Sequence, residues 1–397
     1  MKRRKRHIKS LYYITHTDNI PSILRLGILA HGVVEDQSVP FTKIYDTDIV
    51  SGRQWRKAPN GESLWRFANL YFQPRNPMLY RVIHERGVDH IAILGVTPQV
   101  LELPGVFISM GNAASSLSEI VPAREGLQAI TGELWDVITS DWWREENGSK
   151  RKIMAECLVP GKVPPDSIHT IYVANHQVAD RVREAIRAIA PRVSVVPEPH
   201  MFFLPRRRIP LTPTLSLVDG DMFFSQMQTL TISVNTVGVM GKGLASRAKY
   251  QFPDVYVFYQ DLCRKKVLRM GKPYLYKREV PLDKELAADP FSLPDSHPNR
   301  WFLLFPTKRH WRERSDLEGI EKGLRWIQDN YQTEGIRSLA LPALGCGLGG
   351  LNWRDVGPLI CRYLAHLEIP VAVYLPREGK VPREYLSREF LLGTGGR

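Results

Sequence analysis

The chain of 397 residues is poor in cysteine and contains no long apolar run. Its four cysteines (Cys157, Cys263, Cys346 and Cys361) are scattered, which excludes a disulfide framework and the usual spacings of a metal site. No uncharged apolar stretch is long enough for a membrane-spanning helix. The basic start, MKRRKRHIKS, leads into no apolar signal-peptide core. We therefore expect a cytoplasmic protein with no metal and no membrane partner.

Positive charge, by contrast, is in excess, with a formal net charge of +13. Such a surplus favours a polyanionic partner, because each neutralised phosphate releases condensed counterions. A basic surface that serves solubility alone fits the composition equally well. The hydrophobic fraction of 43% is typical of globular domains with real cores.

A stretch rich in proline and arginine, residues 196–213, has neither a helical nor a strand period and marks a boundary. We predict two domains, residues 1–208 and 209–397. In the second half, predicted strands alternate with helices such as residues 317–331, which indicates an α/β sheet layered by helices. The clearest predicted strands are residues 90–96, 169–175, 229–235, 301–306 and 338–344.

Two glycine-rich loops follow strands in the second half. In residues 231–253, a strand is followed by a turn with Gly238, Gly241 and Gly243 and then by a helix. Such a turn lets backbone N–H groups approach a phosphate, although it could also be a simple strand–helix connector. The second loop, GCGLGG at residues 345–350, also follows a β-like run. Ligands of α/β sheets bind at the carboxyl ends of strands, so a pyrophosphate between the two loops would explain both.

Four motifs of this half, VDGDMF, VNTVGVMGKGLA, FPTKRHWRERS and LPALGCGLGGLNW, resemble those of a macrodomain, and most closely that of the DarG antitoxins. The resemblance spans residues 215–376 and implies a three-layer α/β/α fold that binds and hydrolytically removes DNA-linked ADP-ribose. Asp221 and Met222 would contact the adenine end and Asn235 the distal ribose. Lys308 matches a lysine that acts as nucleophile or electrostatic aid at the anomeric carbon.

The other ADP-ribose contacts that the resemblance implies lie in the two glycine loops: Thr236, Val237, Gly241, Lys242, Gly243, Leu244, Gly345, Cys346, Gly347, Leu348, Gly349 and Gly350. A more distant relative, the human terminal ADP-ribose glycohydrolase, carries an aspartate where Gly349 stands. Asp355 is close by in sequence, but it is better explained as an exposed acid at a helix start.

In the first half, residues 10–29 predict a strand and then a helix capped by Thr17 or Asp18. His16 lies at the junction, where a lone histidine is more often a structural hydrogen-bonding group than a ligand. Residues 65–80 interleave aromatic and basic side chains, which suits stacked bases and phosphates but also suits a core strand. Glu156 lies in an otherwise apolar strand, where it must be paired or functional unless the strand is an edge facing water.

The motifs YYITHTDNIPSILRLGIL, R-x-x-R (residues 53–56), LYFQPRNPMLY, MGNAAS and AECLVP resemble the DarT family over residues 8–205. This implies an ADP-ribosyltransferase fold, α+β with split β-sheets and helices, that transfers ADP-ribose from NAD to a base of single-stranded DNA, thymine being the expected base. The implied NAD-binding residues are Tyr13, Ile14, Thr15, His16, Gly27 and Arg53, and the implied DNA-binding residues are Arg75, Asn76 and Met78.

Arg53 and Glu156 would be catalytic. A fixed carboxylate stabilises the positive charge that builds at the anomeric carbon, and Glu156 could also take the proton from the attacking base. The guanidinium of Arg53 would counter negative charge, with Arg56 as the alternative. The chain departs from the DarT pattern at Tyr12, where YHITH is common, and at the pair Trp65-Arg66, where a His-Asp pair is usual.

Together the halves predict a toxin–antitoxin fusion in which one half ADP-ribosylates DNA and the other reverses the mark, with an intramolecular toxin–antitoxin contact. Two alternatives remain open at this point. One is a protein-directed transferase with a macrodomain that only reads ADP-ribose. The other is a degenerate transferase that leaves a DNA-bound ADP-ribose sensor.

Overall fold

The computed structural model describes residues 8–45, 52–130, 132–140, 143, 148–278, 300–376, 379 and 381–393. They form two compact units, unit 1 and unit 2, which divide between Phe203 and Leu204, within the proline- and arginine-rich stretch. The predicted limit at residues 208/209 stays a prediction. None of the described helices is long and apolar enough to cross a membrane.

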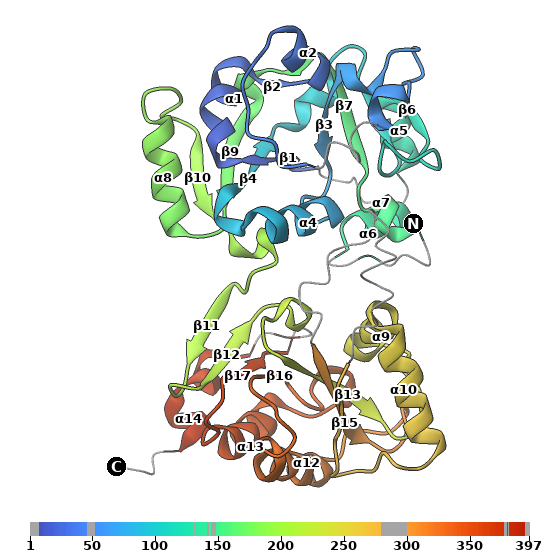
Figure 1. Ribbon diagram of the computed structural model, residues 1–397, viewed down its shortest axis with the longest axis vertical. Helices are drawn as coiled ribbons and strands as arrows, with labels where there is room; N and C mark the ends of the chain where they lie inside the picture. The colour runs from blue at the N-terminus through green and yellow to red at the C-terminus, as the bar shows by residue number, and fades with distance from the viewer. Residues whose placement is uncertain are drawn as a thin grey trace. The chain divides into compact units, whose positions relative to one another are not determined.

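Unit 1 is built on an eight-stranded sheet of order β10-β9-β4-β1-β3-β7-β5-β6 (Figure 1). Neighbouring strands are antiparallel except β9 and β10. The strands are β1 (Leu11–His16), β3 (Phe67–Tyr71), β4 (Ile91–Val96), β5 (Phe107–Ser109), β6 (Ile120–Pro122), β7 (Glu156–Pro160), β9 (Ile168–Val173) and β10 (Ser194–Pro197). A separate ribbon pairs β2 (Ile28–Leu29) with β8 (Lys162–Val163), so the α+β character and the second small sheet expected from the resemblance are both present.

The helices that the described residues of unit 1 form are α1 (Ile20–Leu26), α2 (His31–Asp36), α4 (Pro77–Arg86), α5 (Ala123–Ala129), α6 (Gly132–Ile138), α7 (Ser149–Lys152) and α8 (His176–Ile186). The predicted strand and helix of residues 10–29 are confirmed as β1 and α1, but the predicted cap is wrong. The chain first forms a 3₁₀ turn, Thr17–Asn19, and the Nδ1 atom of His16 caps this turn by accepting the N–H of Asp18 at 3.2 Å. Asn19 precedes α1 and makes no side-chain capping bond.

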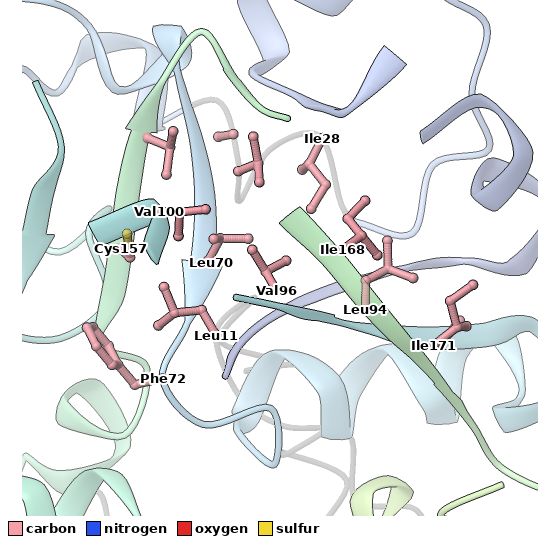
Figure 2. Packing of buried hydrophobic residues seen from close by; sticks show 14 of the residues in the cluster. Leu11, Ile28, Leu70, Phe72, Leu94, Val96, Val100, Cys157, Ile168 and Ile171 are labelled. Carbon is pink, nitrogen blue, oxygen red and sulfur yellow. The ribbon is translucent and has the colours of Figure 1, made fainter. Parts of the chain in front are cut away.

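One face of the unit 1 sheet packs into an apolar core (Figure 2). Leu70 of β3, Leu94 of β4 and Cys157 of β7 belong to this cluster. Because side chains alternate along a strand, the neighbours of Leu70 and Cys157, Tyr71 and Glu156, point to the opposite face. This alternation decides on which side of the sheet the only charged residue of β7 lies.

Unit 2 holds a seven-stranded sheet of order β11-β12-β17-β16-β13-β15-β14. Its five central strands are parallel, and its two edge strands are antiparallel to their neighbours. The strands are β11 (Arg207–Pro210), β12 (Leu215–Asp219), β13 (Thr229–Asn235), β14 (Tyr274–Tyr276), β15 (Trp301–Lys308), β16 (Leu339–Pro342) and β17 (Val371–Tyr374). All five strands that the sequence predicted most clearly are confirmed, as β4, β9, β13, β15 and β16.

Helices cover both faces of this sheet, so unit 2 has the three α/β/α layers expected of a macrodomain (Figure 1). Leu303 and Phe305 of β15 pack with one set of helices, while Phe302 and Leu304 pack with the other. The first set is α12 (Leu317–Asn330), α13 (Trp353–Leu364) and α14 (Arg388–Leu392), and the second is α9 (Gly243–Gln251) and α10 (Pro253–Arg264). A strand buried on both faces is apolar at every position, which is why WFLLFP was readable as a central strand.

Candidate functional sites

A cavity of about 630 Å³ lies in unit 1 between β1, α1, the segment after α2 and the MGNAAS loop. It brings together six of the residues that the sequence assigned to this half: Tyr13, Ile14, Thr15, Gly27, Arg53 and Met78. The segment after α2 is anchored to the start of α1, because the side chain of Asn19 bonds both the N–H and the carbonyl of Thr42, at 2.7 and 2.9 Å.

Gly27 has a backbone reason to be glycine. It ends α1 with φ of +94°, and a Cβ at this position would lie 2.3 Å from the carbonyl oxygen of Val163 on β8. Any side chain would therefore push the end of α1 away from the small ribbon and widen this wall of the cavity.

Arg53 and Glu156 form a buried ion pair. Nη1 of Arg53 lies 3.0 Å from Oε2 and 3.3 Å from Oε1 of Glu156, and the backbone N–H of Ala113 donates to Oε1 at 2.9 Å. Glu156 is 0% exposed, and β7 lies between β3 and β5, so the alternative of an edge strand facing water is wrong. Burial is tolerated because the carboxylate is paired and accepts charge-assisted hydrogen bonds.

The same pair faces the cavity through its arginine. Arg53 lines the cavity, whereas Glu156 lies behind it and does not contribute to the lining. The second terminal nitrogen of Arg53, Nη2, is buried and has no hydrogen-bond partner among the described residues. A buried guanidinium donor without a partner at a cavity wall is suited to an anionic group, such as a diphosphate oxygen.

Arg56, the alternative to Arg53, has a different partner. Its Nη2 atom donates to the backbone carbonyl of Ser118, and it is absent from the cavity lining. Burial, and then the neighbouring charge of Arg53, lower the pKa of Arg56. Arg53 is therefore the arginine that pairs with Glu156, whereas Arg56 contacts the loop at Ser118.

His31 lines the cavity, and its sequence context gave it no role. Its ring stacks on Trp65 at 4.6 Å and meets Tyr45 edge-on at 5.0 Å. Trp65 also donates Nε1–H to Glu35 at 2.8 Å, and Arg66 pairs with Asp36. Trp65 and Arg66, two of the three residues that depart from the DarT pattern, thus hold α2 against the turn that leads into β3, through two contacts across 30 positions that no local pattern signals.

The electrostatic setting of His31 is unusual. Burial, followed by the charge of Arg53, lowers its pKa to about 4, so the imidazole is neutral at neutral pH. Burial likewise raises the pKa of Tyr13, which also lines the cavity, to about 12. Both rings are therefore uncharged hydrogen-bonding surfaces in the cavity.

Three predicted residues of this half lie away from the cavity. Asn76 is fully buried and caps α4, its Oδ1 accepting the N–H of Leu79 at 3.1 Å. Arg75 is buried, lies 3.0 Å from Nε2 of His200 and stacks on Phe203. His16 caps its turn, as described above. These three have structural partners, and their predicted binding roles stay predictions.

A second cavity, of about 820 Å³, lies in unit 2 at the carboxyl ends of the parallel strands β13, β15 and β16. The two glycine loops face each other across it. It brings together twelve predicted residues: Asp221, Met222, Asn235, Gly241, Lys242, Gly243, Leu244, Lys308, Gly345, Cys346, Leu348 and Gly349. Thr236, Val237, Gly347 and Gly350 belong to the same loops but are not part of the lining.

Gly345 shows why the second loop is rich in glycine. Its φ is +72°, and a Cβ there would lie 2.7 Å from Leu351 and 2.9 Å from both Ile320 and Ser315. The backbone must turn in the left-handed region while it is pressed against α12 and its preceding loop, which excludes a side chain. The loop connects β16 to α13, whose first turn carries Asp355 as the exposed acid that the sequence predicted.

Lys308 connects this loop to β15. Its Nζ donates to the carbonyl oxygens of Glu313 at 3.0 Å and Leu348 at 3.3 Å, so the ammonium lies against the glycine loop 40 residues away. Partial burial lowers the pKa of Lys308, and the nearby Glu313 carboxylate opposes this shift. In the sheet, Lys308 is the register partner of Asn235, which places the ends of both strands at one edge of the cavity.

Asn235 and Asp221 organise further parts of the cavity lining. The Asn235 side chain accepts from the N–H groups of Val237 and Val239 and donates to the Val239 carbonyl, so it shapes the first glycine loop. Asp221 accepts the Phe223 N–H at 3.1 Å and pairs with Arg247 of α9.

Several lining residues of this cavity were not assigned a role from the sequence, among them Arg247, Trp311, Arg312 and Ser315. Ser315 is 6% exposed, and its hydroxyl has no hydrogen-bond partner among the described residues. Trp311 and Ser315 were within the quoted motif FPTKRHWRERS, yet only the fold shows that they face the glycine loop. Within the described ranges, no group of three His, Cys, Asp or Glu side chains could hold a metal ion.

Comparisons with known proteins agree with both halves of this arrangement. Residues 12–203 match the family described as DarT, ssDNA thymidine ADP-ribosyltransferase, and residues 233–360 match the macro domain family. The chain is 57% identical over 388 residues to a DNA ADP-ribosyl transferase-DNA ADP-ribosyl glycohydrolase fusion protein of Thermosipho africanus, covering 97% of this chain and 99% of that protein.

Two further comparisons extend this result. The structure of Thermosipho africanus DarTG in complex with ADP-ribose is similar with a TM-score of 0.86 and 56% identity, over 97% of this chain and 100% of that chain. A DNA ADP-ribosyl glycohydrolase of Thermus aquaticus is 38% identical over 165 residues, which are 41% of this chain and 42% of that protein.

Proposed function

The chain belongs to the family of DNA ADP-ribosyl transferase–DNA ADP-ribosyl glycohydrolase fusion proteins, and we infer from this that its two cavities carry opposing reactions. Unit 1 is a DarT-type transferase that attaches ADP-ribose to single-stranded DNA, and unit 2 is a macrodomain that removes it. Two opposing activities of this kind are those of a toxin and its antitoxin. The relatives' activities are directed at DNA, which favours this function over a protein-directed transferase.

We propose NAD as the donor and thymine as the acceptor base. The family description names thymidine, and the unit 1 cavity offers the buried, partnerless Nη2 of Arg53 and the close backbone turn at Gly27 to an anionic dinucleotide. When bound, NAD would supply the ADP-ribosyl group, with nicotinamide as the leaving group. Its binding would draw on Tyr13, Ile14, Thr15 and Gly27, which line one wall.

In the transfer, Glu156 has two tasks. Its carboxylate stabilises positive charge at the anomeric carbon as the nicotinamide bond breaks, and it then takes the proton that the base nitrogen loses as the new C–N bond forms. Arg53 now covers Glu156, so it must shift toward an anionic group in the cavity before the carboxylate can reach the reacting atoms. The Ala113 N–H keeps Oε1 oriented during that shift.

In the removal, Lys308 is the group nearest to the chemistry. Water adds across the C–N bond, its hydroxyl going to the anomeric carbon and its proton to the base nitrogen. The lowered pKa of Lys308 makes its ammonium a better proton donor to the departing base, and its bonds to two carbonyls hold it in place. The same shift enlarges the fraction of neutral amine, so the nucleophilic role that the resemblance implies stays a proposal beside the proton-donating one.

The observation that carries this proposal is the occurrence of both constellations in one chain: Arg53 with Glu156 in unit 1, and Lys308 against the glycine loop in unit 2. The test is to incubate the full chain with NAD and a thymine-containing single-stranded oligonucleotide and to follow its mass. Lys308→Ala should accumulate ADP-ribosylated oligonucleotide, and Lys308→Ala with Glu156→Gln should not. Lys322→Ala, which alters an exposed lysine of α12, is the matched control. No mass gain with Lys308→Ala alone would refute the proposal.

The covalent connection itself would help the second unit. A tethered macrodomain has a high effective concentration near the product of the transferase, so removal can keep pace with attachment without a tight complex. The intramolecular contact predicted from sequence remains a proposal, and a comparison of the intact chain with the two separated halves at equal concentration would test it.

A further inference from the structure

The loop that follows Lys308 presents positive charge and an aromatic ring at the mouth of the unit 2 cavity. Residues 308–314, KRHWRER, carry four lysines and arginines against one glutamate. Trp311 is 48% exposed and, together with Arg312, lines the cavity. The Arg312 guanidinium lies 4.6 Å from the centre of the Trp311 ring. Arg309 is exposed, and its side chain makes no hydrogen bond or ion pair with the described residues.

This loop is rigidly built although it lies on the surface. The N–H of Glu313 donates to the His310 carbonyl at 3.1 Å, and the carboxylate of Glu313 accepts the His310 N–H at 3.2 Å. Arg314 donates to the Gly350 carbonyl at 2.9 Å, and Lys308 donates to the Glu313 carbonyl. The single anion of the loop is therefore used to close its own turn and does not neutralise Arg309 or Arg312.

The two glycine loops add exposed apolar side chains to the cavity lining. Leu348, at the tip of the second glycine loop, is 62% exposed, and Val239 of the first loop is also exposed. Both line the cavity. ADP-ribose carries no apolar group that would call for such a surface beyond its adenine, which the resemblance places at the other end, near Asp221. Exposed apolar side chains beside a polar cleft are typical of a binding surface.

The position of the reacting bond indicates where the DNA strand leaves the cavity. If Lys308 acts at the bond between ADP-ribose and the base, as proposed above, the base and its strand leave the cavity next to Lys308. The residues that continue the chain from Lys308 are Arg309 to Arg314, and two of them, Trp311 and Arg312, line the same cavity as Lys308. This step rests on the proposed function of unit 2.

We propose that Arg309, Trp311 and Arg312, with Leu348 opposite, form a subsite for the single-stranded DNA that flanks the ADP-ribosylated base. Trp311 stacks on a neighbouring base, and the two arginines contact neighbouring phosphates. Aromatic rings interleaved with cations are the general means of binding single strands without reading sequence. The preferred substrate of unit 2 is then an ADP-ribosylated oligonucleotide, and an ADP-ribosylated nucleoside is a poorer one.

The test compares two substrates in the absence of NAD, so that only unit 2 acts. Hydrolysis by the full chain is measured on an ADP-ribosylated single-stranded oligonucleotide and on ADP-ribosylated thymidine. Trp311→Ala should lower kcat/KM about tenfold on the oligonucleotide, which corresponds to the loss of one base–aromatic stack. On the nucleoside it should change kcat/KM less than twofold, and the Kd for free ADP-ribose should stay the same. Trp311→Phe should retain most of the activity.

The role of Arg309 and Arg312 is tested by the salt dependence of oligonucleotide hydrolysis. Arg309→Gln combined with Arg312→Gln should weaken the oligonucleotide reaction and flatten its dependence on salt concentration, because fewer counterions are released. Arg337 is exposed and precedes β16, so it lies at the amino ends of the strands, away from the cavity at their carboxyl ends. Arg337→Gln should therefore behave like the unaltered chain.

Equal losses on both substrates would overturn the subsite by assigning Trp311 to ADP-ribose itself, and no loss on either would overturn it as well. In both of these cases the unaltered chain still hydrolyses both substrates, so the function of unit 2 stands. If the unaltered chain hydrolyses neither substrate, the function of unit 2 fails, and the subsite fails with it.

Discussion

The hydroxyl of Ser315 lies where a side chain at residue 349 would have to begin. A Cβ built on Gly349 would be 2.4 Å from Ser315 Oγ and 3.2 Å from Ser315 Cβ. The two residues are also joined through their backbones, since the Ser315 N–H donates to the Gly349 carbonyl at 2.8 Å. The aspartate that a more distant relative carries at this place therefore cannot be accommodated here beside Ser315.

Replacing Gly349 by alanine should weaken ADP-ribose binding. The φ of Gly349 is not in the left-handed region, so the effect comes from the contact with Ser315 and not from backbone strain. Overpacking of this kind costs about 1–3 kcal/mol, or roughly 5- to 150-fold in Kd if the loop must shift to relieve it. Calorimetric titration of the full chain with ADP-ribose measures the change.

A second substitution serves as the control for this contact. Ser315→Gly removes both atoms that the new Cβ would meet, so Gly349→Ala with Ser315→Gly should bind ADP-ribose more tightly than Gly349→Ala alone. The change in Kd caused by Ser315→Gly is measured both in the unaltered chain and in Gly349→Ala. If Ser315→Gly weakens ADP-ribose binding equally in both, the contact between residues 349 and 315 is not the cause of the loss in Gly349→Ala.

Removing Arg53 should destabilise unit 1 more than removing the whole charge pair. Arg53→Ala leaves the fully buried Glu156 carboxylate without its cation, which costs about 3 kcal/mol or more, whereas Arg53→Ala with Glu156→Gln leaves no buried charge. Protection of β7 amides against hydrogen exchange reports the free energy of opening. Arg56→Ala, which loses only a carbonyl contact, is the comparison, and equal protection in the single and double Arg53 variants would contradict the expectation.

Stability of unit 1 should fall below about pH 6.5 through His31. The unfolded chain binds a proton at an ordinary histidine pKa of about 6.5, whereas folded His31, with a pKa of about 4, stays neutral. The stability linked to His31 is therefore complete above pH 6.5 and is lost between pH 6.5 and 4, by up to about 3 kcal/mol. Denaturant unfolding of the full chain across this range should show a shallower decline in His31→Asn, and an identical decline would exclude His31 as the source.

Trp65 should influence the transferase through His31 and α2. Trp65→Ala removes the ring on which His31 stacks and the bond to Glu35, so we expect the KM for NAD to rise several-fold while kcat changes less. Trp65→Phe keeps a stacking ring and should recover most of the loss, since an aromatic pair contributes about 0.5–1.5 kcal/mol. Steady-state rates of oligonucleotide modification measure both constants. A fall in kcat with an unchanged KM would instead place Trp65 in the chemical step.

Much of this protein can be predicted from local sequence. The strand Thr229–Asn235 was predicted with its observed limits, and the strand at residues 301–306 was recognised because strands buried on both faces are apolar throughout. The two glycine loops were recognisable because a close backbone approach needs glycine wherever it occurs. The acidic residue inside an apolar strand, Glu156, was conspicuous because an unpaired buried carboxylate is too costly to keep. The family assignment followed from such motifs in their order.

The tertiary structure decided which of these residues meet. Arg53 and Arg56 look alike in sequence, yet only Arg53 reaches Glu156, 103 positions away, because β7 lies inside the sheet and its outward face turns toward residue 53. The burial of Arg75 and Asn76, the capping role of His16, the attachment of α2 through Trp65, and the contact of Lys308 with Leu348 also depend on long-range packing. The local sequence determines which backbone conformations are allowed at each position and which side chains are buried. The partners of charged and aromatic side chains are determined only when distant strands pack together and exclude water.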